Sequence, residues 1–370
     1  MDHEAQVAGK LVPPQGSKFS SLQDERMTVL PEALSGQRRT SQRTRQTYAA
    51  LDLGTNNCRL LIARPSGNTF RVVDAFSRII RLGEGVSITH RISEAAIVRG
   101  IAALRICREK MRSRGVTRAR LIATEACRMA ENGIEFRDRV AEQVGLDFEI
   151  VDHATEAELA AFGCSPLMDP RSRGAILFDI GGGSSELVRL GPVDVSRRGP
   201  PVPVIEGWIS LPLGVVTLAE RFGGVTVTPE TFGQMVEAVT EELAGFSARH
   251  GGNLADLHML GTSGTVTTIA GVFLNLMRYD RRKVDGCWLS AHDITQVIDK
   301  LMAMSYDDRA ANPCIGFERA DLVLTGCAIL EAIRRAFPVP RLRVADRGLR
   351  EGMLVQMMRA DGVWDRAGAA

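Results

Sequence analysis

Apolar and polar positions follow two different spacings along the chain, and together these predict a mixture of strands and helices. Short apolar runs that stop at glycine or proline predict strands at 48–54, 58–64, 119–124 and 148–151. Apolar residues at helical spacing predict a helix over 93–113, with Ser93 as its N-cap. Two further helices are expected, one from Glu125 to about Val144 and one opening near Thr155. Strands that alternate with helices are typical of an α/β protein.

The opening pattern recurs about a third of the chain later. Asp52 lies near the end of an apolar strand that runs into a glycine turn and a second strand. Asp179 lies in the same setting, and the strand after its glycine turn begins at Glu186. Two copies of one supersecondary unit predict two lobes built on the same plan.

The pattern also divides the chain into parts. Residues 1–47 are polar and show no sustained periodicity, which predicts a disordered extension. The proline-containing stretch 165–173 predicts a boundary between a first lobe, 48–170, and a second, 171–370. We allow for the helix after Gly352 to cross back to the first lobe.

Composition narrows the function classes. The 370 residues include 45% hydrophobic, 24% charged and only 5% aromatic residues, and the net charge is +2. Few aromatics and little net charge argue against a nucleic-acid partner. Seven scattered cysteines without a CxxC pair favour reduced thiols. No apolar run approaches the ~20 residues of a membrane span and no secretory signal opens the chain, so we expect a cytoplasmic protein without a membrane partner.

The two glycine turns have the chemistry of phosphate-binding loops. Glycine permits a tight turn and leaves successive backbone N–H groups open to an anion, and nearby hydroxyls add donors. An aspartate at each strand end suits a Mg²⁺ (or Mn²⁺) ion that bridges phosphates. The candidate phosphate contacts are Gly54, Thr55, Asn56, Asn57, Gly181, Gly182, Gly183, Ser184 and Ser185. Asp52 and Asp179 are the candidate metal ligands.

Spacing separates these turns from two other phosphate motifs. The chain has no GxxxxGK[ST] and therefore no P-loop. The run GGGSSE lacks the third glycine of a dinucleotide fingerprint and leads into a strand. The alternative is that glycine serves turn geometry alone, but three consecutive glycines and a second copy favour anion binding. A third turn, LGTSGTV, opens a helix whose first amides, at Gly264, also favour an anion.

Seven segments together resemble the exopolyphosphatase / guanosine pentaphosphate phosphohydrolase family, which shares the fold of actin, sugar kinases and chaperone ATPases. Between Tyr48 and Met353 they are, in family order, ALDLGTNNCRLLIAR, RLGEGV, ATEACRMAENG, TEAELAAFG, LFDIGGGSSELV, LGTSGTV and DRGLREGML. The resemblance implies two ribonuclease-H-like lobes with mixed sheets flanked by helices, and an active cleft between the lobes.

The resemblance also implies site residues outside the glycine turns. It matches the general base to Glu156, with Glu158 as the fallback because this chain has Thr155 where the family has an acidic residue. It matches Arg128 to an arginine near the family's cleft, where a guanidinium can hold phosphate. Hydrolysis of a phosphoanhydride needs a group that deprotonates water, whereas the alternative for Glu156 is a favourable contact with a helix dipole.

These expectations describe an exopolyphosphatase that releases orthophosphate from polyphosphate or guanosine pentaphosphate. A small-molecule kinase of the same fold is one rival, since it shares both glycine turns. A non-catalytic polyphosphate or alarmone sensor is the other. The glutamate segment and RLGEGV favour hydrolysis. The sequence does not rank the two substrates, and the homodimer expected from the family is tied to no particular residue.

Overall fold

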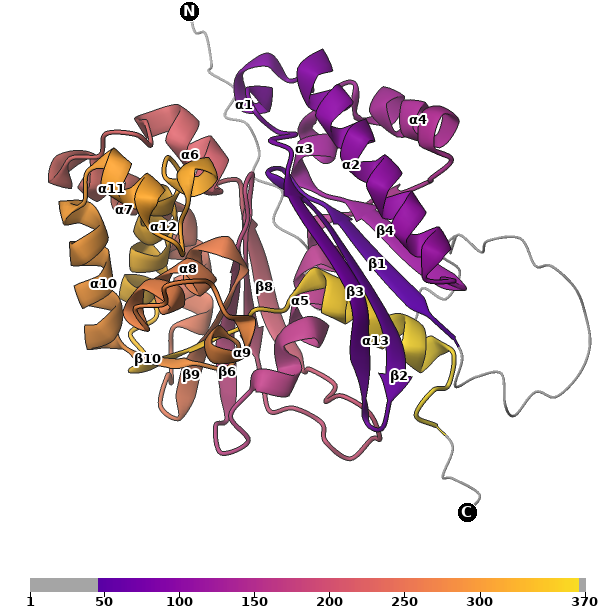
Figure 1. Ribbon diagram of the computed structural model, residues 1–370. Coiled ribbons are helices and arrows are strands. Elements are labelled where there is room, and N and C mark those ends of the chain that lie inside the picture. The colour runs from indigo at the N-terminus through magenta and orange to yellow at the C-terminus, as the bar shows by residue number, and fades with distance from the viewer. Residues whose placement is uncertain (1–45, 366–370) are drawn as a thin grey trace, which may run out of the picture.

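The computed structural model describes residues 46–365, which form two lobes side by side, each built on one sheet (Figure 1). Of the predicted disordered extension, 1–47, all but the last two residues lie outside the described part. Thr47 is buried, and its hydroxyl accepts a hydrogen bond from Arg64 Nε at 2.9 Å. The folded chain therefore begins slightly earlier than the sequence suggested.

The first lobe has a five-stranded mixed sheet in the order β3-β2-β1-β4-β5. Its strands are β1 (Tyr48–Leu53), β2 (Asn57–Ser66), β3 (Thr69–Ile79), β4 (Arg118–Ala123) and β5 (Glu149–Ile150). Its helices are α1 (Val86–Thr89), α2 (Glu94–Ser113), α3 (Glu125–Met129) and α4 (Gly133–Val144). The central strand β1 pairs antiparallel with β2 and parallel with β4. An apolar core fills the space between the sheet and the helices.

Local hydrogen bonds explain where two predicted helices begin and end. The Ser93 side chain accepts from Ala96 N and caps α2, as predicted. The single helix expected from Glu125 to Val144 is instead two helices, α3 and α4. Asn132 lies in the interruption and bonds to both backbone groups of Ile92, at 2.8 and 2.9 Å. These bonds hold the chain in a turn that a continuous helix would not allow.

The second lobe has a six-stranded sheet in the order β10-β11-β9-β6-β7-β8. Its strands are β6 (Gly174–Ile180), β7 (Ser185–Leu190), β8 (Ile205–Leu211), β9 (Leu257–Thr262), β10 (Trp288–Ser290) and β11 (Arg341–Val344). Its α-helices are α6 (Val215–Phe222), α7 (Pro229–His250), α8 (Ser263–Phe273), α9 (Arg281–Val284), α10 (Ala291–Ala303), α11 (Tyr306–Ala311) and α12 (Val323–Ala336). Two 3₁₀ turns, η2 (Ser165–Leu167) and η3 (Phe317–Arg319), complete the connections.

The two sheets contain the same central unit. In the first lobe β1 pairs antiparallel with β2 and parallel with β4; in the second, β6 pairs antiparallel with β7 and parallel with β9. The turns match as well: Gly54 N donates to Asn57 O at 2.9 Å, and Gly181 N donates to Ser184 O at 3.0 Å. The repeated pattern in the sequence therefore corresponds to a repeated hairpin.

Two helices lie between the sheets, and each covers the sheet of the other half of the chain. Helix α13 (Leu349–Ala360), yellow in Figure 1, packs against β1 and β2 of the first sheet. Helix α5 (His153–Cys164) packs against β7 and β8 of the second sheet and against α13. The predicted boundary near residue 170 therefore separates the two sheets. It does not assign each helix to the sheet that it covers.

Glycine allows α5 and α13 to touch through their backbones. A Cβ atom placed on Gly163 would lie 2.0 Å from Gly348 O. One placed on Gly352 would lie 2.0 Å from Leu159 O. Both distances are far below van der Waals contact, so any larger residue would force the helices apart.

None of the helices within residues 46–365 is long and apolar enough to cross a membrane. All seven cysteines are free thiols, and six of them are buried. Cys58 and Cys107 come closest, with 3.9 Å between their sulfur atoms.

We expect Gly352→Ala to lower the free energy of unfolding by about 1–3 kcal/mol, because overpacking must separate α5 from α13. The matched control is Gly245→Ala in α7, where an added Cβ has no neighbour within 4 Å. That control should raise stability by roughly 0.5–1 kcal/mol, since alanine is the better helix former. Thermal unfolding of both variants checks this, and equal shifts would contradict the packing argument.

Candidate active site

A cleft of about 500 Å³ lies between the lobes, and both glycine hairpins line it. The two turns also touch each other. A Cβ atom added to Gly182 would lie 2.9 Å from Thr55 Cβ, and one added to Gly183 would lie 2.9 Å from Thr55 Oγ1. The glycine run therefore lets the turn of the second lobe approach that of the first, in addition to leaving amides open to a ligand.

The cleft gathers most of the residues that the sequence singled out. Those that line it are Asp52, Gly54, Thr55, Asn56, Asn57, Glu156, Asp179, Gly181, Gly182, Gly183, Ser184 and Gly264. They come from segments far apart in the chain, so the fold brings the predicted phosphate and metal groups to one place. Arg128 and Ser185 are absent from the lining.

Ser185 is fully buried in β7, and its hydroxyl donates to Leu213 O at 2.7 Å. The prediction that Ser185 offers a hydroxyl to phosphate is therefore corrected: the side chains of a strand alternate between faces, and this one points into the lobe. Its neighbour Ser184 does line the cleft.

Glu156 lies in the first turn of α5 and is only 5% exposed. Asp152 caps that turn by accepting from Thr155 N at 2.8 Å. The fallback candidate, Glu158, accepts a hydrogen bond from Gln356 Nε2 of α13 at 3.0 Å and does not line the cleft. Of the two glutamates, only Glu156 lines the cleft.

Arg128 lies behind the cleft and holds carboxylates. Its Nη1 donates to Glu156 Oε1 at 2.7 Å, and its Nε donates to Glu125 Oε2 at 3.0 Å. The guanidinium also contacts His153 Nδ1 at 3.0 Å and the carbonyl of Val151. These partners occupy the guanidinium of Arg128, so the structure places it on carboxylates and not at the predicted position for a phosphate contact.

Among the residues that the sequence analysis missed are Glu125 and Glu186, which line the cleft, and His153, which lies beside Glu186. Glu186 lies directly opposite Asp179 across the β6–β7 hairpin, the position that Arg59 has opposite Asp52 in the first lobe. Its Oε1 accepts from Ser184 Oγ at 2.8 Å and from Ser210 Oγ at 2.9 Å. The hairpin register was the signal that could have found Glu186.

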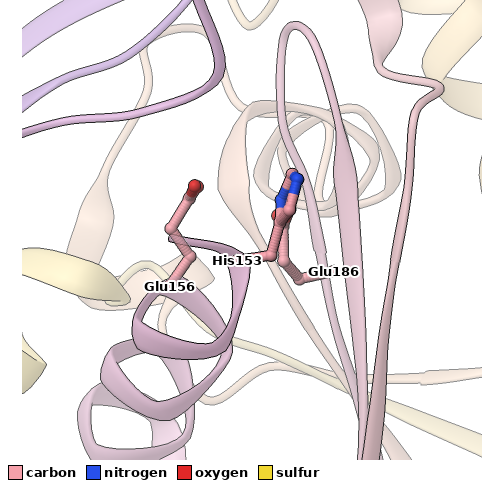
Figure 2. A group of neighbouring side chains, drawn as sticks. All are labelled: His153, Glu156 and Glu186. Carbon is pink, nitrogen blue, oxygen red and sulfur yellow. The ribbon is translucent and has the colours of Figure 1, made fainter. Parts of the chain in front are cut away.

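Figure 2 shows His153 beside Glu186, with Glu156 on the same helix as His153, α5. One potential ligand atom of each lies within 4.8 Å of the other two. Within residues 46–365, no other group of three such side chains comes together in this way. Asp52 and Asp179, the predicted metal ligands, line the same cleft.

The lobes are also tied together beside the cleft, around a smaller pocket that Arg81, Glu220 and Asp321 line. Arg81, from the RLGEGV segment, donates to Asp321 Oδ2 at 3.1 Å and to Glu318 O at 3.3 Å. Glu220 of the second lobe accepts from Gly85 N at 2.8 Å. These contacts hold the two walls of the cleft in a fixed relation.

The model of the Ppx/GppA phosphatase family matches residues 61–361. The chain belongs to the Ppx/GppA phosphatase family. The match takes in the second lobe's sheet and the segment that carries Glu156, and it begins after the first glycine turn.

Solved structures agree with this membership. A PPX-GPPA enzyme from Aquifex aeolicus is 30% identical, with a TM-score of 0.69 over 84% of this chain and 99% of that chain. An exopolyphosphatase-like protein is also 30% identical, with a TM-score of 0.75 over 85% and 98%. An exopolyphosphatase from Cytophaga hutchinsonii, 24% identical, has the same fold, with a TM-score of 0.76 over 85% and 98%. The predicted two-lobe, actin-like fold is confirmed.

Buried carboxyl groups lie close together in the cleft of this Ppx/GppA member. Burial, and then the neighbouring Asp179, raise the pKa of Glu186 to about 7. Burial raises the pKa of Asp179 to about 6, opposed by Arg59 and reinforced by Asp52. Burial and Glu186 raise the pKa of Glu156, which Arg128 partly offsets. Crowded carboxylates of this kind favour protonation or a bound cation.

We expect the metal-free protein to lose stability as the pH rises from about 4.5, the ordinary pKa of glutamate, to about 7. In this window folded Glu186 keeps a proton that the unfolded chain releases, so a higher pH favours unfolding. Glu186→Gln should flatten this slope. Thermal unfolding with EDTA at a series of pH values measures it; identical slopes for both proteins would exclude Glu186 as the cause.

Proposed function

We propose that this Ppx/GppA family member is an exopolyphosphatase, which hydrolyses the terminal phosphoanhydride bond of polyphosphate and releases orthophosphate. Guanosine pentaphosphate offers the same terminal bond and is the second candidate substrate. The observation that carries the proposal is a single cleft that joins two glycine hairpins to Glu156. The names of the similar structures, exopolyphosphatase among them, support the same reaction class.

The terminal phosphates are bound by the two turns. Backbone N–H groups of the hairpins and of Gly264 donate to phosphate oxygens, and Thr55 Oγ1 adds a donor from the first lobe. Because the turns lie against each other, one phosphate contacts both lobes at once. Phosphoryl transfer depends mostly on such positioning and on charge stabilisation.

Glu156 takes a proton from the attacking water. The water oxygen forms a bond to the terminal phosphorus, the bridging P–O bond breaks, and the shortened chain leaves as a phosphate anion. Arg128 holds the Glu156 carboxylate by a charge-assisted hydrogen bond and opposes the rise in its pKa, which keeps the group available as a base.

A divalent cation, Mg²⁺ or Mn²⁺, fits the donor set of the cleft. The groups available are carboxylate oxygens, which both ions prefer. The pKa values of Asp179 and Glu186 are raised by burial first and by the neighbouring carboxylates second, and a bound cation would offset that neighbouring charge. We propose Asp52, Asp179 and Glu186 as the ligands. When bound, the ion would offset the charge of the phosphates and polarise the bond to be cleaved.

Replacing the base tests the mechanism. We expect Glu156→Gln to lower kcat for orthophosphate release by about 10²–10⁴-fold while polyphosphate binding persists, because only proton transfer is lost. The matched control is Glu158→Gln, on the same helix but facing α13, which should keep near-normal turnover. Equal losses in both variants would indicate a structural effect rather than catalysis.

The substrate comparison also separates the rival functions. Orthophosphate release with Mg²⁺ and no acceptor is measured for long-chain polyphosphate, guanosine pentaphosphate and ATP. Release from either of the first two supports a hydrolase, whereas release that requires an added acceptor indicates a kinase. Tight binding with no release indicates a sensor. The expected homodimer and cytoplasmic location stay predictions.

Metal binding has its own readout. We expect titration of Mn²⁺ into the protein, followed by electron paramagnetic resonance, to show a bound ion in the wild type and at least tenfold weaker binding in Asp179→Asn, which removes one anionic ligand. EDTA should abolish orthophosphate release, and Mg²⁺ should restore it. Unaltered Mn²⁺ binding by the variant would remove Asp179 from the ligand set.

A further inference from the structure

A histidine and two glutamates come together where the start of α5 packs against β7. His153 and Glu156 lie in the first turn of α5, and Glu186 lies in β7 (Figure 2). One potential ligand atom of each lies within 4.8 Å of the other two. The reaction proposed above uses the carboxylates, and its Mg²⁺ or Mn²⁺ ligands are all carboxylates. The imidazole of His153 has no part in it.

The contact with Arg128 sets the tautomer of His153. A guanidinium nitrogen can only donate, so Nδ1 of His153, which lies 3.0 Å from Arg128 Nη2, is the ring nitrogen with the free lone pair. The same Nδ1 lies 3.9 Å from Glu186 Oε1. The proton of the neutral ring is then on Nε2, which lies 3.8 Å from Glu125 Oε2. A metal-bound imidazole usually points its other nitrogen at a carboxylate in this way, and that carboxylate orients the ring.

Each of the two carboxylates in the group keeps one oxygen for a ligand. Glu156 accepts a hydrogen bond from Arg128 through Oε1, and Glu186 accepts from two serine hydroxyls, also through Oε1. In the part of the chain that the structure describes, Oε2 of neither glutamate accepts a hydrogen bond. Both side chains are buried and both line the cleft. A buried carboxylate oxygen without a donor favours a cation.

The charges around the imidazole match a divalent cation. Three glutamates surround it, namely Glu125, Glu156 and Glu186, and among residues 46–365 Arg128 is the one permanently charged cation that pairs with any of them. Three carboxylates against one guanidinium leave an excess of two negative charges, which one divalent ion balances. His153 is only partly buried, so an ion can reach the group from solvent.

We propose that His153, Glu156 and Glu186 bind a transition-metal ion that accepts nitrogen ligands, with Zn²⁺ as its representative. An imidazole nitrogen selects such ions over Mg²⁺, which prefers oxygen ligands. Three protein ligands leave a further coordination position for water or a phosphate oxygen. At Nδ1 the ion takes the place of Arg128, which keeps its hydrogen bond to Glu125.

An ion at this position would inhibit the proposed reaction. It would take the carboxylate of Glu156, which then could not accept a proton from the attacking water. It would also compete with Mg²⁺ for Glu186, which belongs to both ligand sets. This effect on turnover rests on the proposed function, whereas the binding of the ion does not.

A titration tests the binding. Zn²⁺ is added to the wild type, His153→Gln and His292→Gln in competition with a chromophoric chelator. We expect His153→Gln to bind Zn²⁺ about tenfold more weakly than the wild type or worse, because one of three ligands is lost. His292 is exposed on α10 and belongs to no group of this kind within residues 46–365, so His292→Gln should bind like the wild type. Equal affinities of the wild type and His153→Gln would overturn the proposal.

X-ray absorption at the zinc edge identifies the ligands independently of affinity. We expect the signature of one imidazole in the loaded wild type and its loss in His153→Gln. Sulfur ligands, or no imidazole in the wild type, would place the ion elsewhere and refute the site. The affinity for Mg²⁺ should be the same in both proteins, because the oxygen ligands remain. A matching fall in Mg²⁺ affinity would count against His153 as a selective nitrogen ligand.

Turnover gives a separate readout. Orthophosphate release from long-chain polyphosphate is measured with Mg²⁺ at a series of buffered free Zn²⁺ concentrations, and each protein is compared with its own zinc-free rate. We expect Zn²⁺ to inhibit the wild type, and half-inhibition of His153→Gln to need about tenfold more Zn²⁺. Equal inhibition of both, or a rate raised by Zn²⁺, would contradict the inhibitory role. If no substrate releases orthophosphate, the proposed function fails, while the titration and the X-ray absorption still decide on the metal site.

Discussion

The two sheets face each other across a cleft because the backbones of α5 and α13 touch. Gly163 and Gly352 remove the side chains that would separate the helices, and each helix covers the sheet of the other half of the chain. This contact fixes how far the lobes stand apart. At that separation Gly182 and Gly183 reach Thr55, and the two phosphate-binding turns become one site rather than two.

The cleft combines groups that repel one another in the absence of a ligand. Asp179, Glu186 and Glu156 are held close by the hairpin register and by the first turn of α5, and Arg128 offsets only part of their charge. Repulsion between these carboxylates lowers the stability of the folded protein. A cation bound together with a phosphate chain would reduce that repulsion. The stability of the empty protein and its affinity for ligands are therefore linked.

Local sequence patterns predicted the parts of the site that are local. The hairpins at Asp52 and Asp179 follow from short strands and glycine. The helix that carries Glu156 was expected to open near Thr155, and it begins two residues earlier, at His153, because Asp152 caps it. The resemblance to a family supplied the role of Glu156. What the sequence missed depends on pairing or packing between distant segments. The place of Glu186 in the site depends on the register of the β6–β7 hairpin. The contact between Arg128 and Glu156 depends on the packing of α3 beside α5. The way in which α5 and α13 each cover the sheet of the other half of the chain depends on both lobes being folded.

The duplicated hairpin has a further consequence. Seven positions after its aspartate, the first copy carries Arg59 and the second carries Glu186, each directly across its hairpin from that aspartate. Two halves with one backbone plan thus place opposite charges at equivalent positions. Both side chains line the cleft, so the repeated hairpin presents a ligand with a cationic group from one lobe and a carboxyl group from the other. The duplication therefore supplies the backbone of the site twice but its charged groups only once each.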